Sequence, residues 1–269
     1  MKSLKALVKQ SMPVAWGVAS RAWHQSRQRR FERRMKRISD DYIKNCGLVV
    51  RHGPFAGMTY VSKAFSSMAL PKLIGSYEAE LHESLGRLFT KNYATVVDVG
   101  CAEGYYAVGL AMRFPTARVH AFDLDPDARQ LCEKVAIANR VDGRVSVQGG
   151  CDVDCLKSLP LEHALIFCDC DGYELALLDP TLVPALALAD LVIETHDCYN
   201  PIITSTLVAR FTPTHDIELI YSVPRDPAPY LELEFLSRSD RSLAVNEIRP
   251  PQQWAFMTPR ESNQSSPVV

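Results

Sequence analysis

The sequence of 269 residues predicts an α/β fold in which a doubly wound, mostly parallel sheet of about seven strands is flanked by helices. From residue 95 onward, short apolar runs alternate with segments of helical spacing, which is the pattern of strands joined by crossover helices. Several runs end in glycine turns or carboxylates, as strands do at the ligand-binding edge of such sheets. A hydrophobic content of 47% is sufficient for the core of one large domain.

The first predicted strand, 96–99, runs into a turn that contains Gly100 and Gly104, and a helix starts near Glu103. Glycines allow a tight turn and close approach of a ligand to the backbone, and a helix start presents free N–H groups. The spacing is G-x-x-x-G, whereas a dinucleotide fingerprint requires G-x-G-x-x-G. Two acids, Asp98 and Glu103, disfavour a diphosphate and favour a ligand with a cationic amino group and ribose hydroxyls.

This turn resembles the first motif, D-x-G-x-x-x-G, of class I S-adenosylmethionine-dependent methyltransferases. S-adenosylmethionine carries an amino group, a ribose and a sulfonium charge, so its chemistry suits the two acids. The alternative is an ordinary buried strand followed by a tight turn.

The second strand, 118–122, is followed by Asp123, which lies 23 residues after Gly100. An acid at about this distance commonly binds ribose hydroxyls, so we predict that Asp123 is the ribose ligand. Asp125 is interpreted as the cap of a helix that Pro126 opens. The third strand, 144–148, leads to Asp152, for which a contact to the adenine amino group and a solvated turn are alternatives.

The fourth and fifth strands end in D-x-D-G-x-E, residues 169–174, and I-E-x-H, residues 193–196. These runs resemble the FkbM-type methyltransferases, which carry D-x-E-G-x-E and E-x-H. The chain departs from that pattern at Asp171, which replaces Glu, and at Tyr173, which replaces a small residue. The resemblance covers about residues 75–197 and includes a G-x-Y-E-x-E-L run at 75–81. Tyr77 and Glu78 in that run either wall the methionine end of the cofactor or simply begin an amphipathic helix.

We therefore expect a Rossmann-like methyltransferase domain over residues 47–257. The basic charge and helical spacing of residues 1–46 predict a helical leader, and residues 258–269 are expected to form a disordered tail. A β-hairpin is predicted at 47–62, a sixth strand at 216–221, and an antiparallel last strand at 254–257. The residues predicted to bind S-adenosylmethionine are Tyr77, Glu78, Asp98, Gly100, Cys101, Glu103, Gly104, Asp123, Asp152 and Asp169.

Methyl transfer to a hydroxyl needs alignment and a base that accepts the hydroxyl proton. His196 is the first candidate because its ordinary pKa is near neutral, and Asp171 and Asp169 follow. A histidine bonded to a backbone carbonyl in the core is the alternative. No resident metal is predicted, although a cluster on this rim could hold a divalent ion. The cluster consists of Asp169, Asp171, Glu194, His196 and Asp197.

The net charge of −1 hides an asymmetry. Residues 1–37 hold eleven basic residues and one acid, which leaves 19 basic and 30 acidic residues in the remainder. The arginines lie opposite an apolar stripe of helical spacing. Three interpretations are open for the leader: docking on its own acidic domain, contact with an anionic membrane surface, and a nucleic-acid arm, which is the least favoured.

The sequence thus predicts an S-adenosylmethionine-dependent enzyme that O-methylates a sugar, a lipid head group or a small metabolite. The alternatives are a membrane- or partner-binding scaffold with a non-catalytic cofactor site, and an NAD-type oxidoreductase on the same fold. Eight scattered cysteines without a C-x-x-C pair favour a reduced, cytoplasmic chain, with peripheral membrane contact through the leader as an option.

Overall fold

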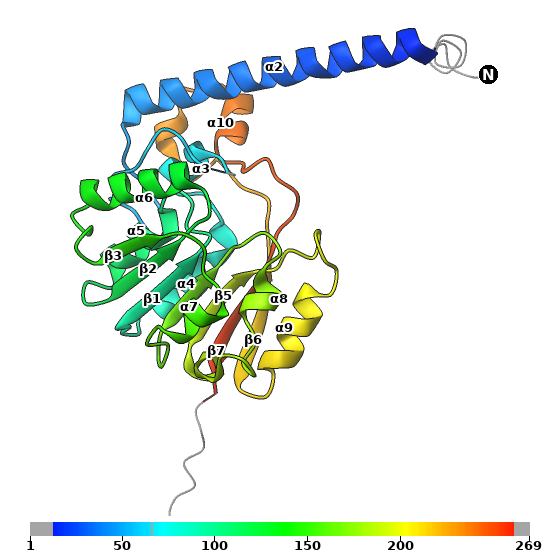
Figure 1. Ribbon diagram of the computed structural model, residues 1–269. Helices are drawn as coiled ribbons and strands as arrows, with labels where there is room; N and C mark the ends of the chain where they lie inside the picture. Colours follow the sequence, from blue (N-terminus) through cyan, green and yellow to red (C-terminus); the bar gives the residue numbers. More distant parts are fainter. Residues whose placement is uncertain (1–12, 66, 261–269) are drawn as a thin grey trace, which may run out of the picture.

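The computed structural model describes residues 13–65 and 67–260, whose centre is a seven-stranded sheet in the order β3-β2-β1-β4-β5-β7-β6 (Figure 1). Neighbouring strands are parallel except at β7, which runs antiparallel to both β5 and β6. The predicted Rossmann-like sheet is therefore confirmed. The strands are β1 Thr95–Val99, β2 Arg118–Phe122, β3 Val145–Gln148, β4 Leu165–Cys168, β5 Asp190–Glu194, β6 His215–Tyr221 and β7 Gln253–Pro259.

Alternate residues of the central strands enter two separate hydrophobic clusters, one on each face of the sheet. Val96 and Val192 belong to one cluster, whereas Val97 and Leu191 belong to the other. This alternation is the period of a strand that is covered on both faces. The helices are α2 Pro13–Cys46, α3 Ala69–Ile74, α4 His82–Leu88, α5 Tyr105–Arg113, α6 Pro126–Ala138, α7 Val153–Lys157, α8 Glu174–Leu177, α9 Ile203–Phe211 and α10 Arg238–Ala244.

The chain reverses its direction of travel across the sheet between β1 and β4. It runs outward from β1 through β2 to β3 and then returns to place β4 on the other side of β1. Loops that leave adjacent strands at such a switch point turn away from each other and open a crevice. The fold therefore places a ligand-binding crevice at the carboxyl ends of β1 and β4.

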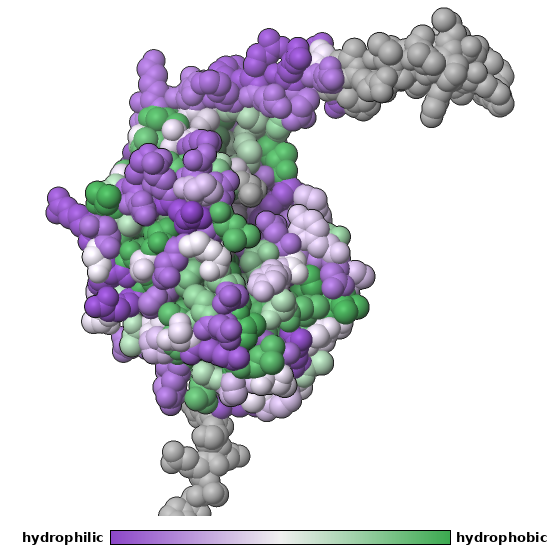
Figure 2. Space-filling view, viewed as in Figure 1, coloured by the Kyte–Doolittle hydropathy of each residue, from purple (hydrophilic) through white to green (hydrophobic). Residues whose placement is uncertain are grey.

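The described part of the leader is one long helix, α2, which begins at Pro13 and extends beyond the body of the domain (Figure 1). Toward its end, Met35, Ile38 and Tyr42 are buried in the core of the domain. Arg34 and Arg37 both donate to Asp240 of α10, at 2.7 and 2.8 Å. In Figure 2, the visible surface of the part of α2 that is not grey is mostly hydrophilic. No helix among the described residues is long and apolar enough to cross a membrane.

The predicted hairpin at 47–62 is wrong as a pair of strands. A single antiparallel bridge joins Val49 and Thr59, and turns occupy most of the sequence between them. The ladder ends after Val50, because the N–H of Met58 donates to Phe55 within the turn and the N–H of Gly57 donates to Val50 in its place. Of the predicted tail, Thr258 and Pro259 belong to β7, and residues 261–269 lie outside the described residues.

Candidate active site

A cavity of about 900 Å³ lies at the carboxyl ends of β1, β2, β4 and β5. Its wall brings together predicted residues from six separate segments of the chain. Those that line it are Tyr77, Gly100, Cys101, Asp123, Asp152, Asp169, Asp171 and His196. Four further predicted residues, Glu78, Asp98, Glu103 and Gly104, lie behind this wall.

The turn after β1 depends on Gly100. Its φ is +88°, and a Cβ at this position would lie 1.6 Å from the carbonyl oxygen of Asp169. The amides of Gly100 and Cys101 both donate to the carbonyl of Phe122, at 2.8 and 2.9 Å. The turn is thus fixed against both β2 and β4, and any side chain at residue 100 would force these strands apart.

Gly104 adopts φ +91° directly before α5 and has a structural role. A Cβ there would lie 2.8 Å from the sulfur of Cys132 in α6. Gly104 therefore permits α5 and α6 to pack closely, and no atom of it lines the cavity. The helix begins at Tyr105, two residues later than the sequence predicts.

Asp123 is held in place by backbone amides at the end of β2. One carboxylate oxygen accepts from the amide of Ala102 and the other from the amide of Asp125, both at 2.8 Å. Each oxygen retains a lone pair for a ligand in the cavity. A carboxylate fixed in this way can accept two neighbouring hydroxyl groups at once.

Asp125 and Asp152, which follow β2 and β3 at the carboxyl edge of the sheet, are helix caps. Asp125 accepts from the amides of Asp127 and Ala128 at the start of α6, which confirms the capping interpretation. Asp152 caps α7 by accepting from the amide of Cys155 at 2.8 Å, and it also lines the cavity. A contact of Asp152 with a ligand stays a prediction.

Glu103 does not face the cavity, which corrects the prediction that it contacts a ligand directly. Its buried carboxylate accepts from Lys72 at 2.5 Å, from the amide of Phe65 at 2.9 Å and from the hydroxyl of Tyr60. Burial acts to raise the pKa of Glu103, but the charge of Lys72 and these hydrogen bonds hold it below its ordinary value. Lys72 itself lines the cavity, so Glu103 positions a cation there.

Asp98 lies one layer below the wall, so a direct ligand contact at this residue is also corrected. It is 1% exposed, and its Oδ2 has no hydrogen-bond partner in the described structure. Burial, together with the charges of Asp169 and Asp123, raises the pKa of Asp98 to about 8. Near neutral pH this carboxyl is therefore mostly protonated.

Tyr77 and Glu78 take different positions. Tyr77 lines the cavity, whereas the carboxylate of Glu78 accepts from Arg249 at 2.5 Å and from the hydroxyl of Tyr106. Glu78 adopts φ +45° and does not line the cavity. Burial raises the pKa of Glu78 to about 7. The prediction that both residues line the methionine end of the cofactor site is thus corrected for Glu78. This residue instead binds Arg249, which lines the cavity.

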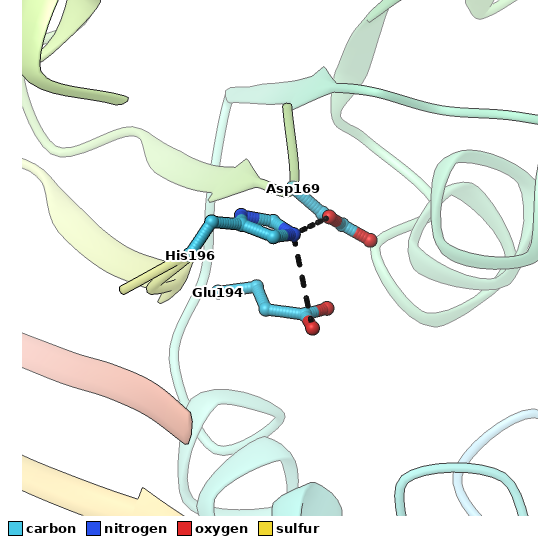
Figure 3. Close-up of side chains that lie close together, drawn as sticks. All are labelled: Asp169, Glu194 and His196. Atoms are coloured by element: carbon cyan, nitrogen blue, oxygen red, sulfur yellow. Dashed lines mark ion pairs between the residues drawn. The ribbon is translucent and has the colours of Figure 1, made fainter. Parts of the chain in front are cut away.

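His196 stands at the centre of an acidic cluster at the ends of β4 and β5 (Figure 3). Its Nδ1–H donates to Glu174 at 2.6 Å, because a carboxylate can only accept. Its Nε2 lies 3.4 Å from Asp169, 3.6 Å from Asp171 and 3.9 Å from Glu194. The ring lines the cavity and is not bonded to a core carbonyl, so the alternative interpretation of His196 is wrong.

The electrostatics of this cluster follow from burial and from repulsion among carboxylates. Burial and the charge of Asp169 raise the pKa of Glu194 to about 10. Burial also raises the pKa of Asp169, against the opposing effect of His196. Burial acts to lower the pKa of His196, but its bond to Glu174 and the charge of Asp169 raise it overall. The cluster therefore stabilises positive charge.

Arg249 is a member of this site that sequence reasoning missed. It lines the cavity and donates to Glu247 at 2.9 Å as well as to Glu78. Arg249 lies in a loop more than fifty residues beyond His196 and belongs to no recognisable sequence motif. The sequence alone therefore does not indicate that it lines the cavity. Glu174 was also missed as the partner of His196, although it closes the D-x-D-G-x-E run.

No protein-family model and no curated protein matches the sequence. Among solved structures, the chain is similar to the O-methyltransferase TomG from Streptomyces achromogenes, crystallised with S-adenosylmethionine. The identity is 15%, the match covers 67% of this chain and 79% of that one, and the TM-score is 0.44.

Two further solved structures are similar to this chain at comparable identity. An O-methyltransferase from Bacillus cereus, crystallised with S-adenosylhomocysteine, is 14% identical over 64% of this chain and 77% of that one, with a TM-score of 0.42. A precorrin 8w decarboxylase from Methanobacterium thermoautotrophicum is 17% identical over 67% and 89%, with a TM-score of 0.46. At such identities the likeness is one of fold alone, and the predicted FkbM-type subfamily stays a prediction.

Proposed function

We propose that this protein is an S-adenosylmethionine-dependent methyltransferase that methylates a hydroxyl oxygen. The observation that carries the proposal is the order of groups along the rim of the sheet. Asp152 follows β3, Asp123 follows β2, Gly100 follows β1, and the cluster around His196 follows β4 and β5. This order supports the proposal because it matches the order of groups along the cofactor, with Asp152 proposed for the adenine, Asp123 for the ribose, the Gly100 turn for close backbone approach and the His196 cluster for the reacting end.

The cavity fits this cofactor in size and charge. A volume of about 900 Å³ lies within the range of small-molecule sites. Asp123 offers two fixed acceptor oxygens to a ribose, and the acids of β4 and β5 favour a cationic sulfur beside them. The cofactor, when bound, supplies a methyl group on that sulfur.

The residues of the cluster act on the acceptor. A bound cofactor would supply the methyl group, and these residues would hold the acceptor hydroxyl oxygen toward it. The hydroxyl proton must pass to a base on the protein, for which Nε2 of His196 and the carboxylate of Asp171 are within reach of the same space. Asp171 is exposed, so the reaction centre opens to solvent and admits an acceptor from outside.

The acceptor class that we propose is a sugar hydroxyl, a lipid head group or a small metabolite, as in an FkbM-like enzyme. Support for this finer proposal comes from the two runs 169–174 and 193–196, whose acids and histidine converge in one cluster. The open rim, where Tyr173 and Tyr199 are 47% and 65% exposed, suits an acceptor that is only partly enclosed.

The proposal is tested by calorimetric titration of the full chain with S-adenosylmethionine, S-adenosylhomocysteine and NAD. We expect binding of the first two and none of NAD. Preferential binding of NAD would favour an oxidoreductase, and absence of binding by all three would overturn the proposal. Binding without transfer of labelled methyl to pools of sugars, lipids and metabolites would favour the non-catalytic scaffold.

A further inference from the structure

Three potential metal ligands converge at the β4–β5 end of the cavity. They are a carboxylate oxygen of Asp169, a carboxylate oxygen of Glu194 and a ring nitrogen of His196, all within 4.8 Å of one another. Figure 3 shows both carboxylates directed at the same ring nitrogen. Because β4 and β5 are adjacent and parallel, with Cys168 opposite Ile193, the sheet itself brings these positions together. Among the residues whose side chains the structure describes, 25–65 and 67–260, no second group of three such ligands is found.

The imidazole is oriented for coordination by Glu174. This glutamate is fully buried and accepts the Nδ1–H of His196 at 2.6 Å, which directs Nε2 toward Asp169 and Glu194. A carboxylate behind a histidine ring is the usual partner of a metal-bound imidazole, since it fixes the ring and increases the basicity of the ligating nitrogen. A base that only shuttles protons would not require the two additional carboxylates.

A second observation, the environment of Glu194, favours a cation at this position. Glu194 is 1% exposed, and its Oε2 has no hydrogen-bond partner in the described structure. The nearest cation to that oxygen is Arg249 at 3.5 Å, which also pairs with Glu78 and Glu247. Burying a carboxylate oxygen without a hydrogen-bond partner costs free energy of folding. A guanidinium that is shared among three glutamates offsets only part of that cost.

We propose that Asp169, Glu194 and His196 bind one divalent transition-metal ion of the Mn²⁺, Fe²⁺, Co²⁺ or Zn²⁺ type. Two carboxylate oxygens and one imidazole suit these ions, whereas Mg²⁺ and Ca²⁺ prefer oxygen ligands alone. All three side chains line the cavity, so the open coordination positions face the acceptor space.

The ion deepens the proposed function and rests on it for its role in methyl transfer. Nε2 of His196 becomes a ligand, so it no longer serves as the base. An ion held there would supply Lewis-acid activation of an acceptor hydroxyl, and the carboxylate of Asp171 would take the hydroxyl proton. Asp171 lies 3.6 Å from Nε2 and is not needed as a ligand.

The test is metal binding by the full chain, stripped with a chelator and titrated without any cofactor. Mn²⁺ is counted from the electron paramagnetic resonance signal of the free ion, and Zn²⁺ is titrated by calorimetry. We expect one ion per chain. Glu194→Gln and His196→Ala should lose binding, and Glu174→Gln should weaken it by about 10- to 100-fold. Asp169→Asn replaces either ligand variant that fails to fold, as judged by circular dichroism.

The matched controls are Glu162→Gln and His163→Ala, which alter exposed residues before the opposite, amino end of β4. They should bind the ion as the unchanged chain does. Absence of Mn²⁺ and Zn²⁺ binding, or binding that survives every ligand substitution, overturns the site. A parallel titration with S-adenosylmethionine separates the two proposals: cofactor binding without an ion rejects only the metal site, and an ion without cofactor binding rejects only the methyltransferase.

Discussion

The two halves of the ligand rim are built in different ways. In the half formed by β1 and β2, backbone amides hold Asp123, whose carboxylate faces the cavity from the end of β2. In the half formed by β4 and β5, side chains hold one another, as Glu174 holds His196 and Arg249 holds Glu78. The first half thus depends on local backbone geometry and the second on charge balance between distant segments. Backbone changes should therefore damage the first half, and changes of charge the second.

The largest effect is expected for Gly100→Ala, because the two halves meet at this residue. Its φ of +88° and the 1.6 Å approach of a new Cβ to the Asp169 carbonyl leave no room for a side chain. We expect a loss of about 4 kcal/mol or more in the free energy of unfolding, measured by urea denaturation. Gly143→Ala, where a Cβ meets no atom within 4 Å, should change it by less than about 0.5 kcal/mol. Equal changes of unfolding free energy in the two variants would show that the turn at Gly100 can shift to accept a side chain, and would contradict this prediction.

The second expected effect concerns Asp98, the buried carboxyl under the first half. Its pKa of about 8 exceeds the ordinary 3.8, so the folded state keeps a proton that the unfolded state has lost. The stability contributed by this proton is fully present below pH ~4 and is lost as pH rises toward 8. Asp98→Asn should reduce the fall in unfolding free energy between pH 5 and pH 9, by an amount on the order of a few kcal/mol. Parallel pH profiles of the two proteins would contradict this account.

The third expected effect distinguishes binding from stability at Asp123. Asp123→Ala should weaken S-adenosylmethionine binding by about 1.5–3 kcal/mol, the scale of a hydrogen bond to a charged group. Asp127→Asn removes a nearby exposed carboxylate at the start of α6 and should leave the affinity within about 0.5 kcal/mol. Calorimetry on both folded variants makes the comparison. An unchanged affinity in Asp123→Ala would reject it as the ribose ligand.

The smallest effect is expected at the contact between α2 and the domain. Asp240→Ala removes a carboxylate that binds two arginines of α2 and should cost about 1 kcal/mol in unfolding free energy. Asp40→Ala removes only an exposed pair with Lys36 within the helix, and should cost less than about 0.5 kcal/mol. If both substitutions cost the same in urea denaturation, the long-range contact adds nothing to the docking of α2.

The comparison also explains what the sequence could predict. The strands of the sheet, the turn at Gly100 and the acid at Asp123 lie in contiguous segments whose periodicity and spacing are local properties. The cap at Asp125 was identifiable for the same reason, because Pro126 follows it directly.

Long-range contacts account for the errors. The sequence predicts a ligand contact for Glu103 because it does not reveal that Lys72, 31 residues away, binds this carboxylate. Arg249 reaches Glu78 across 171 residues, so neither side chain could be oriented from its own segment. The hairpin at 47–62 reduces to one bridge because the N–H of Met58 donates to Phe55 in the turn and not across to Val50, a choice that the alternating sequence pattern does not reveal.

The most direct test of the central claim is a crystal structure of the protein with S-adenosylhomocysteine. The account expects the ribose hydroxyls within hydrogen-bond distance of Asp123, the adenine toward Asp152, and the sulfur facing the cluster of Asp169, Glu194 and His196. A ligand bound elsewhere, or one whose sulfur points away from that cluster, would contradict it.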